Sequence, residues 1–294
     1  MSTPADIAIP EQINVARVPP AHEETSFAKN PSANMFIALA TWIASVALLL
    51  LPQFFALPYV AMRFRGVQPT AETLLADKNF ILIMVAGVLP AHIYTLIIVW
   101  LVATRFGERS IIDALALKWD GKFTIARSVG LAIVLYVAAL LLTMAFGGQG
   151  TALDKLVESS RAAALTIAFL AVATAPIVEE SIYRGILYPA FARVSGAKVA
   201  IIVVTILFAL PHVPQYWPNI AVIASITLLS VVLTILRAWT GRLLPCVAVH
   251  LVFNGIQSVI IIFDPYLRAA FENMRHARGT SSILHLLTCF INGL

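Results

Sequence analysis

Long apolar stretches, rather than alternating apolar and polar positions, dominate the pattern along this chain. Seven such stretches follow one another, near residues 35–60, 80–102, 129–146, 162–193, 199–212, 220–236 and 244–263. Several of them reach the roughly 20 residues that a helix needs to cross the hydrocarbon core of a bilayer. Because lipid cannot hydrogen-bond the backbone and the runs are continuous, helices are favoured over the strands of a barrel. The pattern predicts an all-α, polytopic transmembrane helical bundle of about seven to eight spans.

The two ends of the chain differ from this central part. Residues 1–34 are polar and contain five prolines, which predicts a disordered N-terminal arm. They lack the basic-then-apolar pattern of a cleavable signal peptide, so we expect the first span itself to direct insertion. Residues 35–264 are then one transmembrane helical domain. Residues 265–294 are expected to form an amphipathic tail or a partial eighth span.

Composition and charge support a membrane protein. Hydrophobic residues make up 60% of the chain and charged residues only 12%, against about 25% charged residues in soluble domains. The net charge is +5 without a dense basic cluster, so no nucleic-acid partner is expected. Eleven Lys and Arg residues fall on the side of the N-terminus and eight on the other, which favours a cytoplasmic N-terminus. Cys246 and Cys289 form no disulfide framework.

Three ionisable residues lie inside the fourth span: Glu179, Glu180 and Arg184. Each charge inside a span costs roughly 2.5–3.5 kcal/mol on insertion scales, so such groups mark functional sites or pair with one another. Arg184 lies four positions after Glu180, where the two can pair on a helix, and Glu179 points about 100° away from Glu180. One carboxylate can be held by the arginine while the other serves as an acid or base. The alternative is a buried ion pair that only fixes helix packing.

His212, His250 and Asn254 lie in two further spans, and each alone is most often a packing or capping residue. Their depths change this interpretation. Glu179 and His212 each lie 14 residues from a basic residue at the same membrane side, roughly 21 Å along a helix. Asn254 lies about 18 Å from that side by the same measure. Three separate spans therefore bring polar groups to a similar depth, and we expect these groups to meet.

These residues also form an ordered set of motifs. Glu179-Glu180-Ser-Ile-Tyr-Arg184, Phe208-x-x-x-His212 and His250-x-x-x-Asn254 occur in this order. The set resembles the CAAX-protease and bacteriocin-processing family of intramembrane glutamic endopeptidases, which includes the type II CAAX prenyl endopeptidases, over about residues 162–263.

The resemblance implies a role for each motif residue. Glu179 is expected to be the general base that activates water together with His212, while His250 and Asn254 stabilise the oxyanion. Glu180 and Arg184 are expected to be a structural, orienting pair. The implied substrate is a membrane-associated peptide or protein that is prenylated or carries a leader. The lack of an organelle signal and the compact size favour a multi-pass protein of a bacterial plasma membrane, with a eukaryotic endoplasmic reticulum as the alternative.

Three alternatives stay open. Glu179, His212 and His250 could act as two-His, one-carboxylate zinc ligands, although no His-Glu-x-x-His helix is present and we expect no cofactor. The chain could be a non-catalytic scaffold of the same fold. It could also be a proton-coupled transporter, against which the sequence shows no internal repeat. His92, in the second span, is expected only to pack.

Overall fold

The computed structural model describes residues 31–119, 121 and 123–278, and within these residues the elements are helices joined by turns, with no strand. The helices of the first half are α1 (Pro31–Leu48), α2 (Leu51–Arg63), α3 (Ala71–Ala76), α4 (Lys78–Ala86), α5 (Val88–Thr104), α6 (Ile111–Ala114), α7 (Ile125–Phe146) and α8 (Ala152–Ser159). Those of the second half are α9 (Arg161–Phe169), η1 (Leu170–Thr174), α10 (Ala175–Glu180), η2 (Ser181–Leu187), α11 (Tyr188–Ala209), η3 (Leu210–His212), α12 (Val213–Tyr216), α13 (Ile220–Thr240) and α14 (Leu244–Arg278).

Six segments of the described residues are long and apolar enough to cross a membrane. One of them, Arg161–Tyr216, is 56 residues long and contains two crossings. Gly196 divides this segment into two helical parts. Its φ of 78° and ψ of 163° are values that residues other than glycine rarely adopt. The rings of Tyr183 and Phe208 lie 4.8 Å apart, so the chain reverses between them. The predicted helical bundle is confirmed, and the chain is a multi-pass membrane protein.

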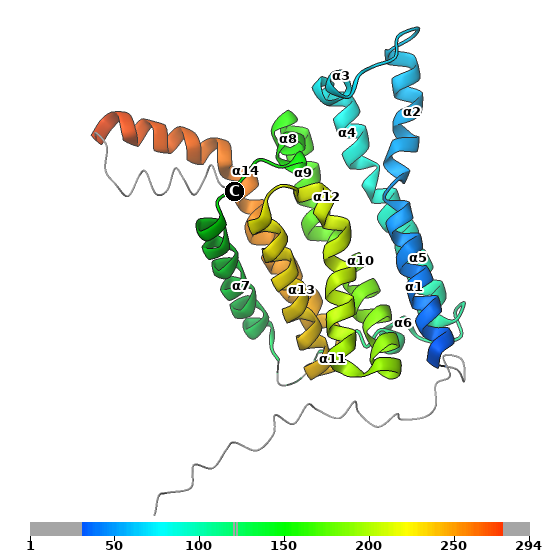
Figure 1. Cartoon of the computed structure of the whole chain (residues 1–294). Coiled ribbons are helices and arrows are strands. Elements are labelled where there is room, and N and C mark those ends of the chain that lie inside the picture. The colour runs from blue at the N-terminus through cyan, green and yellow to red at the C-terminus, as the bar shows by residue number, and fades with distance from the viewer. Residues whose placement is uncertain (1–30, 120, 122, 279–294) are drawn as a thin grey trace, which may run out of the picture.

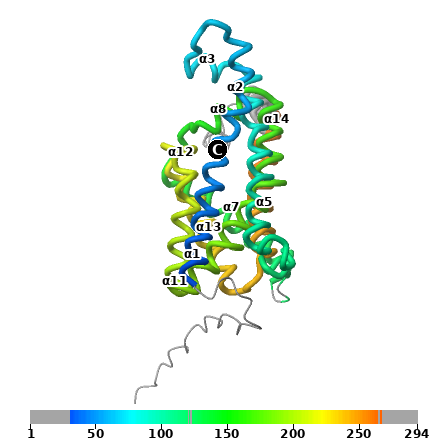
Figure 2. The backbone as a smooth tube through the Cα atoms, turned by 90° about the vertical axis from the view of Figure 1, so that its right-hand side faces the viewer, coloured from blue at the N-terminus to red at the C-terminus, as the bar shows by residue number. Residues whose placement is uncertain are grey.

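The helices pack as a bundle whose centre is the second half of the chain. In Figure 1, α7, α13, α14 and α11 stand side by side, with α1 and α5 along one flank. Figure 2 shows the same bundle from its side, with the loop around α3 projecting beyond one end. One core cluster joins α11 to α1 and α5, and a second joins α7, α13 and α14. The helix that carries Glu179 and Glu180 lies between the two clusters and contacts both α5 and α14.

The fourth span is not a regular α-helix. Two π-helical segments, η1 and η2, flank the short α10 that carries both glutamates. Pro176 lies in the first turn of α10. A proline has no backbone N–H to donate and so disturbs the ladder of hydrogen bonds. Such π-helical segments, in which the helix makes a wide turn, are rare in proteins. Those that do occur are often found at functional sites.

The first and the last helix of the described residues are longer than the sequence predicts. Helix α1 begins at Pro31 rather than after residue 34, and residues 1–30 of the predicted arm lie outside the described residues. Helix α14 continues to Arg278, and its last part, coloured orange in Figure 1, turns away from the bundle. Residues 265–278 are therefore helical. Residues 279–294, which contain the expected partial eighth span, lie outside the described residues.

Candidate active site

A cavity of about 400 Å³ lies at the centre of the bundle. Most of its walls are apolar, from α1, α4, α5, α7 and α13, and its polar lining includes four of the motif residues: Glu179, His212, His250 and Asn254. These four come from α10, η3 and α14. The structure thus brings together side chains that lie up to 75 positions apart in the sequence, at one internal surface.

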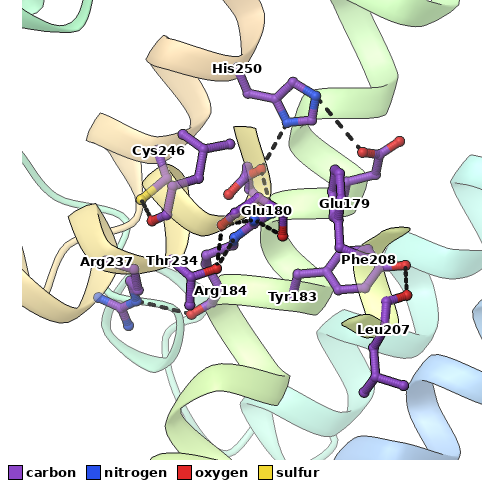
Figure 3. Close-up of polar contacts among 12 residues, drawn as sticks. Glu179, Glu180, Tyr183, Arg184, Leu207, Phe208, Thr234, Arg237, Cys246 and His250 are labelled. Carbon is purple, nitrogen blue, oxygen red and sulfur yellow. Dashed lines mark hydrogen bonds and ion pairs between the residues drawn. The ribbon is translucent and has the colours of Figure 1, made fainter. Parts of the chain in front are cut away.

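Glu180 and Arg184 are not part of that surface. Both side chains are fully buried and form an ion pair, with Nη1 of Arg184 3.1 Å from Oε1 of Glu180. Arg184 also donates to the hydroxyl of Ser230 at 2.8 Å and to that of Thr234 at 3.2 Å, both on α13. Figure 3 shows this network directly below the two glutamates. A buried guanidinium that is paired and hydrogen-bonded in this way fixes α10 and η2 against α13.

His250 connects the buried pair to the cavity. Its Nδ1 lies 2.8 Å from Oε1 of Glu180, and its Nε2 lies 3.8 Å from Oε2 of Glu179. Figure 3 shows the ring between the two carboxylates. Because an ionised carboxylate only accepts hydrogen bonds, Nδ1 carries a proton and donates to Glu180. The ring is therefore held at one nitrogen and directs the other toward Glu179 and the cavity.

His212 is oriented by its own backbone and by two aromatic rings. Its Nδ1 donates to the carbonyl of Phe208 at 2.7 Å, since a carbonyl oxygen can only accept. In the neutral ring this leaves the lone pair on Nε2, which can accept a proton. The ring stacks on Phe208 with centroids 5.1 Å apart and on Tyr216 with centroids 6.3 Å apart. The ring of His212 is thus held in one orientation on the cavity wall.

Asn254 donates from Nδ2 to the carbonyl of Ala171 at 2.9 Å. Ala171 belongs to η1, where the wide turn alters the usual pattern of backbone hydrogen bonds. An amide carries two N–H donors, so this bond orients the side chain and still leaves a second donor. Asn254 therefore has the chemistry needed to bind a developing negative charge at the cavity surface.

The structure adds a third imidazole that the sequence analysis assigned only to packing. His92 of α5 is 8% exposed and lines the same cavity. The hydroxyl of Thr174 donates to the carbonyl of Leu170, so it accepts from Nδ1 of His92 at 2.7 Å. His92 and Thr174 lie 82 positions apart. The sequence signal for this placement is the depth of His92 within its span, which is also the signal shared by the other polar groups of the site.

Arg237 is a second residue whose place the sequence did not indicate. It was counted as a charge at the end of a span, yet it is 8% exposed. Its Nε donates to the carbonyl of Arg184 at 2.9 Å, which Figure 3 shows at the edge of the network. The carbonyl lies in η2. Arg237 therefore stabilises the wide turn that follows the two glutamates.

The possible zinc ligands named from the sequence are Glu179, His212 and His250, which all line the cavity. Among the described residues, no three His, Cys, Asp or Glu side chains converge closely enough to hold a metal ion. The expectation that the site uses no metal ion stays a prediction.

Comparison with known protein families gave a match in the second half of the chain. Residues 161–256 match the family model described as type II CAAX prenyl endopeptidase Rce1-like. This segment begins at α9 and ends within α14, so it contains every motif residue but neither His92 nor the helices α1 to α8. Searches of the curated proteins and of the solved structures found no match.

Proposed function

We propose that the chain, whose residues 161–256 match the Rce1-like family of type II CAAX prenyl endopeptidases, is an intramembrane endopeptidase that uses Glu179 to activate water. The observation that carries this proposal is the shared cavity: a carboxylate, two imidazoles and an amide from separate helices line one internal surface. Peptide hydrolysis requires a base for water and donors for the oxyanion, and these four side chains supply both.

In the proposed reaction, Glu179 accepts a proton from a water molecule, and His212 hydrogen-bonds the same water through Nε2. The water oxygen attacks the carbonyl carbon of the scissile bond and forms a tetrahedral intermediate. Glu179 then returns the proton to the leaving nitrogen as the C–N bond breaks. This assignment is supported by the fixed orientation of His212, whose Nδ1 is bound to the Phe208 carbonyl at 2.7 Å.

The oxyanion would be stabilised by Asn254 and His250. Asn254 keeps one amide N–H beyond its bond to Ala171. Nε2 of His250 can donate when the ring is an imidazolium. The positive charge of that form would be balanced by Glu180, 2.8 Å from Nδ1, and by Glu179, 3.8 Å from Nε2. Oriented donors of this kind act strongly because the surrounding site has a low dielectric constant. Glu180 and Arg184 hold His250 in place and take no part in bond making.

The walls of the cavity support the proposed substrate class. They are mainly Leu, Val, Ile, Phe and Tyr side chains, which suits a peptide bond presented next to an apolar or lipid-modified segment. We propose a membrane-associated peptide, prenylated or carrying a leader, as substrate. We also propose the plasma membrane of a bacterium as the location, with the N-terminus in the cytoplasm.

The experiment is a cleavage assay with the purified full chain in detergent. It compares a farnesylated peptide, the same peptide without the lipid, and a leader peptide, with products identified by mass spectrometry. Cleavage at one defined bond in any of them, lost in Glu179→Gln, supports the proposal. A folded protein that cleaves none of them but carries protons in proteoliposomes is a transporter. One that does neither is a scaffold, and either result overturns the proposal.

The same assay tests the metal-free site. Treatment with a strong chelator, followed by removal of the chelator, is expected to leave the cleavage rate unchanged within about twofold, because the proposed acid–base groups need no Lewis acid. A rate that disappears with the metal and returns with one zinc ion per chain would replace the proposed mechanism with a zinc mechanism.

A further inference from the structure

A second cavity, of about 390 Å³, lies at the end of the bundle where α1 begins. It lies between the first turn of α1, the segment that links α5 to α6, and the first part of α11. Figure 1 shows these three parts together at the lower end of the molecule. The cavity shares no lining residue with the central one. Arg193, on its wall, follows Glu179 by 14 residues, roughly 21 Å along a helix.

Two arginines and one aspartate supply the charged groups of its lining. Arg109 and Arg193 both line it, together with Ser110 and Asp113. The carboxylate of Asp113 is paired with Lys118 at 2.5 Å, so its charge is already balanced. Burial and the positive charge of Arg105, together with that of Arg193, lower the pKa of Arg109. Two guanidinium groups on one concave surface bind a phosphate or carboxylate well, because each offers paired N–H donors.

A buried polar atom in the same cavity also indicates a ligand. Asn34 is only 4% exposed and lines the cavity. Its Oδ1 is buried and has no hydrogen-bond partner among the described residues. A buried acceptor without a donor is energetically unfavourable, so a native site normally supplies one. The ligand should therefore combine an anionic group for the arginines with a hydroxyl or amine donor for Asn34.

The surroundings of the cavity indicate where such a ligand would come from. Asn34, Thr104 and Arg193 all lie near the ends of membrane-crossing helices, where headgroups are found. Beside the cavity, Phe36 and Ile37 of α1 and Ile112 of α6 expose apolar side chains. Basic pockets between transmembrane helices bind the headgroups of anionic lipids. A lipid whose anionic headgroup lies in the cavity could thus place its acyl chains along α1.

We propose that this cavity binds the headgroup of an anionic glycerophospholipid such as phosphatidylglycerol. Arg109 and Arg193 bind its phosphate, and a headgroup hydroxyl donates to Oδ1 of Asn34. The proposal is independent of the proteolytic function, because the two cavities have no residue in common.

The test measures lipid binding to the purified full chain in detergent, by native mass spectrometry and by the lipid-dependent shift of the unfolding midpoint. We expect phosphatidylglycerol to bind saturably and phosphatidylcholine not to compete. Replacing both arginines (R109Q/R193Q) should weaken phosphatidylglycerol binding at least about 20-fold, since each basic side chain near a headgroup contributes roughly 1 kcal/mol. The control Lys198→Gln lies on α11 at the same end but does not line the cavity, and it should bind as the wild type does.

Two further arms identify the ligand. Glycerol 1-phosphate should cause no shift at concentrations where the lipid saturates, because it lacks acyl chains; an equal effect would mean a soluble phosphate ester and would overturn the lipid assignment. Asn34→Ala should reduce phosphatidylglycerol affinity to that of phosphatidylmethanol, which has no headgroup hydroxyl, and leave phosphatidylmethanol binding unchanged. Unchanged phosphatidylglycerol binding in R109Q/R193Q, with an unfolding midpoint near that of the wild type, overturns the proposal as a whole.

Discussion

His250 donates from Nδ1 to Oε1 of Glu180 across 2.8 Å, and this contact joins the buried ion pair to the cavity. The same carboxylate oxygen accepts from Arg184 at 3.1 Å. Glu180 therefore has two partners, one that fixes its own helix and one on α14 that reaches the site. The neighbouring Glu179 contacts His250 from the cavity side at 3.8 Å. Two adjacent glutamates thus act on one imidazole from opposite sides, with different burial.

This difference in burial predicts that substituting Glu180 lowers stability, whereas substituting Glu179 lowers activity and leaves stability nearly unchanged. Glu180→Gln should lower the free energy of unfolding by about 3–5 kcal/mol, because it leaves the buried guanidinium of Arg184 without a counter-charge. Glu179→Gln should change it by less than about 0.5–1 kcal/mol, since the side chain of Glu179 is 23% exposed and faces the cavity. Thermal unfolding in detergent measures both. Equal destabilisation by the two variants would contradict the division of roles.

Asn254 is predicted to act on the transition state. Asn254→Ala should lower kcat by about 10²–10³, the usual loss when an oxyanion donor is removed, with little change in KM. Gln257 lines the same cavity one turn further along α14, and Gln257→Ala is the matched control, expected to keep kcat within about threefold. Steady-state kinetics on one peptide substrate give kcat and KM for the two variants and for the wild type. An increase in KM alone for Asn254→Ala would assign the residue to substrate binding.

The close packing of α2 against α4 depends on a glycine. A Cβ atom on Gly87 would lie 2.9 Å from the Cα of Pro52, a backbone atom that cannot move aside easily. Gly87→Ala should therefore destabilise the protein by about 1–3 kcal/mol. Gly130 of α7 has no atom within 4 Å of an added Cβ, so Gly130→Ala should be neutral or stabilise by up to about 1 kcal/mol. Unfolding midpoints of the two variants, measured together, provide the comparison.

Asp77 predicts a pH dependence outside the membrane spans. Burial alone would raise the pKa of Asp77, but hydrogen bonds from Phe80 N, the Tyr59 hydroxyl and Asn79 N, with the charge of Arg63, lower it overall. Because the folded pKa of Asp77 lies below the ordinary value of an aspartate, the stabilisation is complete above that ordinary value. It is lost as the pH falls through the folded pKa.

Hydrogen exchange at residues 78–81 tests this prediction. Asp77→Ala should speed exchange there at pH 6, because the N-terminal amides of α4 lose the carboxylate that caps them. As the pH is lowered from 6 through the folded pKa of Asp77, the exchange of the wild type should approach that of the variant, after correction for intrinsic exchange. A difference between the two proteins that does not shrink over this fall in pH would show that the charge of Asp77 does not stabilise this turn.

The fold followed from the sequence because lipid restricts the backbone so strongly. Continuous apolar runs permit little except helices in a bilayer, and the predicted start of α13 at Ile220 and of α14 at Leu244 agree with the structure. The motif residues were predicted to meet because three spans place polar groups at one depth. The chemical role of each stays a prediction.

The interruptions of the fourth span could not be predicted in the same way. A π turn depends on how neighbouring helices satisfy the carbonyls it disturbs, and here those partners are Asn254 and Arg237. Both lie more than 50 positions from the carbonyl they bind. His92 was assigned to packing for a similar reason, since its partner Thr174 lies 82 positions away. Hydrophobic periodicity carries no information on such distant pairs.

The measurement that most directly tests the account is single-turnover cleavage of a membrane-associated peptide by Glu179→Gln, in a preparation whose unfolding midpoint matches that of the wild type. We expect the rate to fall by at least about 10³, because the amide cannot accept a proton from water. Cleavage at the wild-type bond with a rate within a few-fold of the wild type would mean that Glu179 does not activate the water.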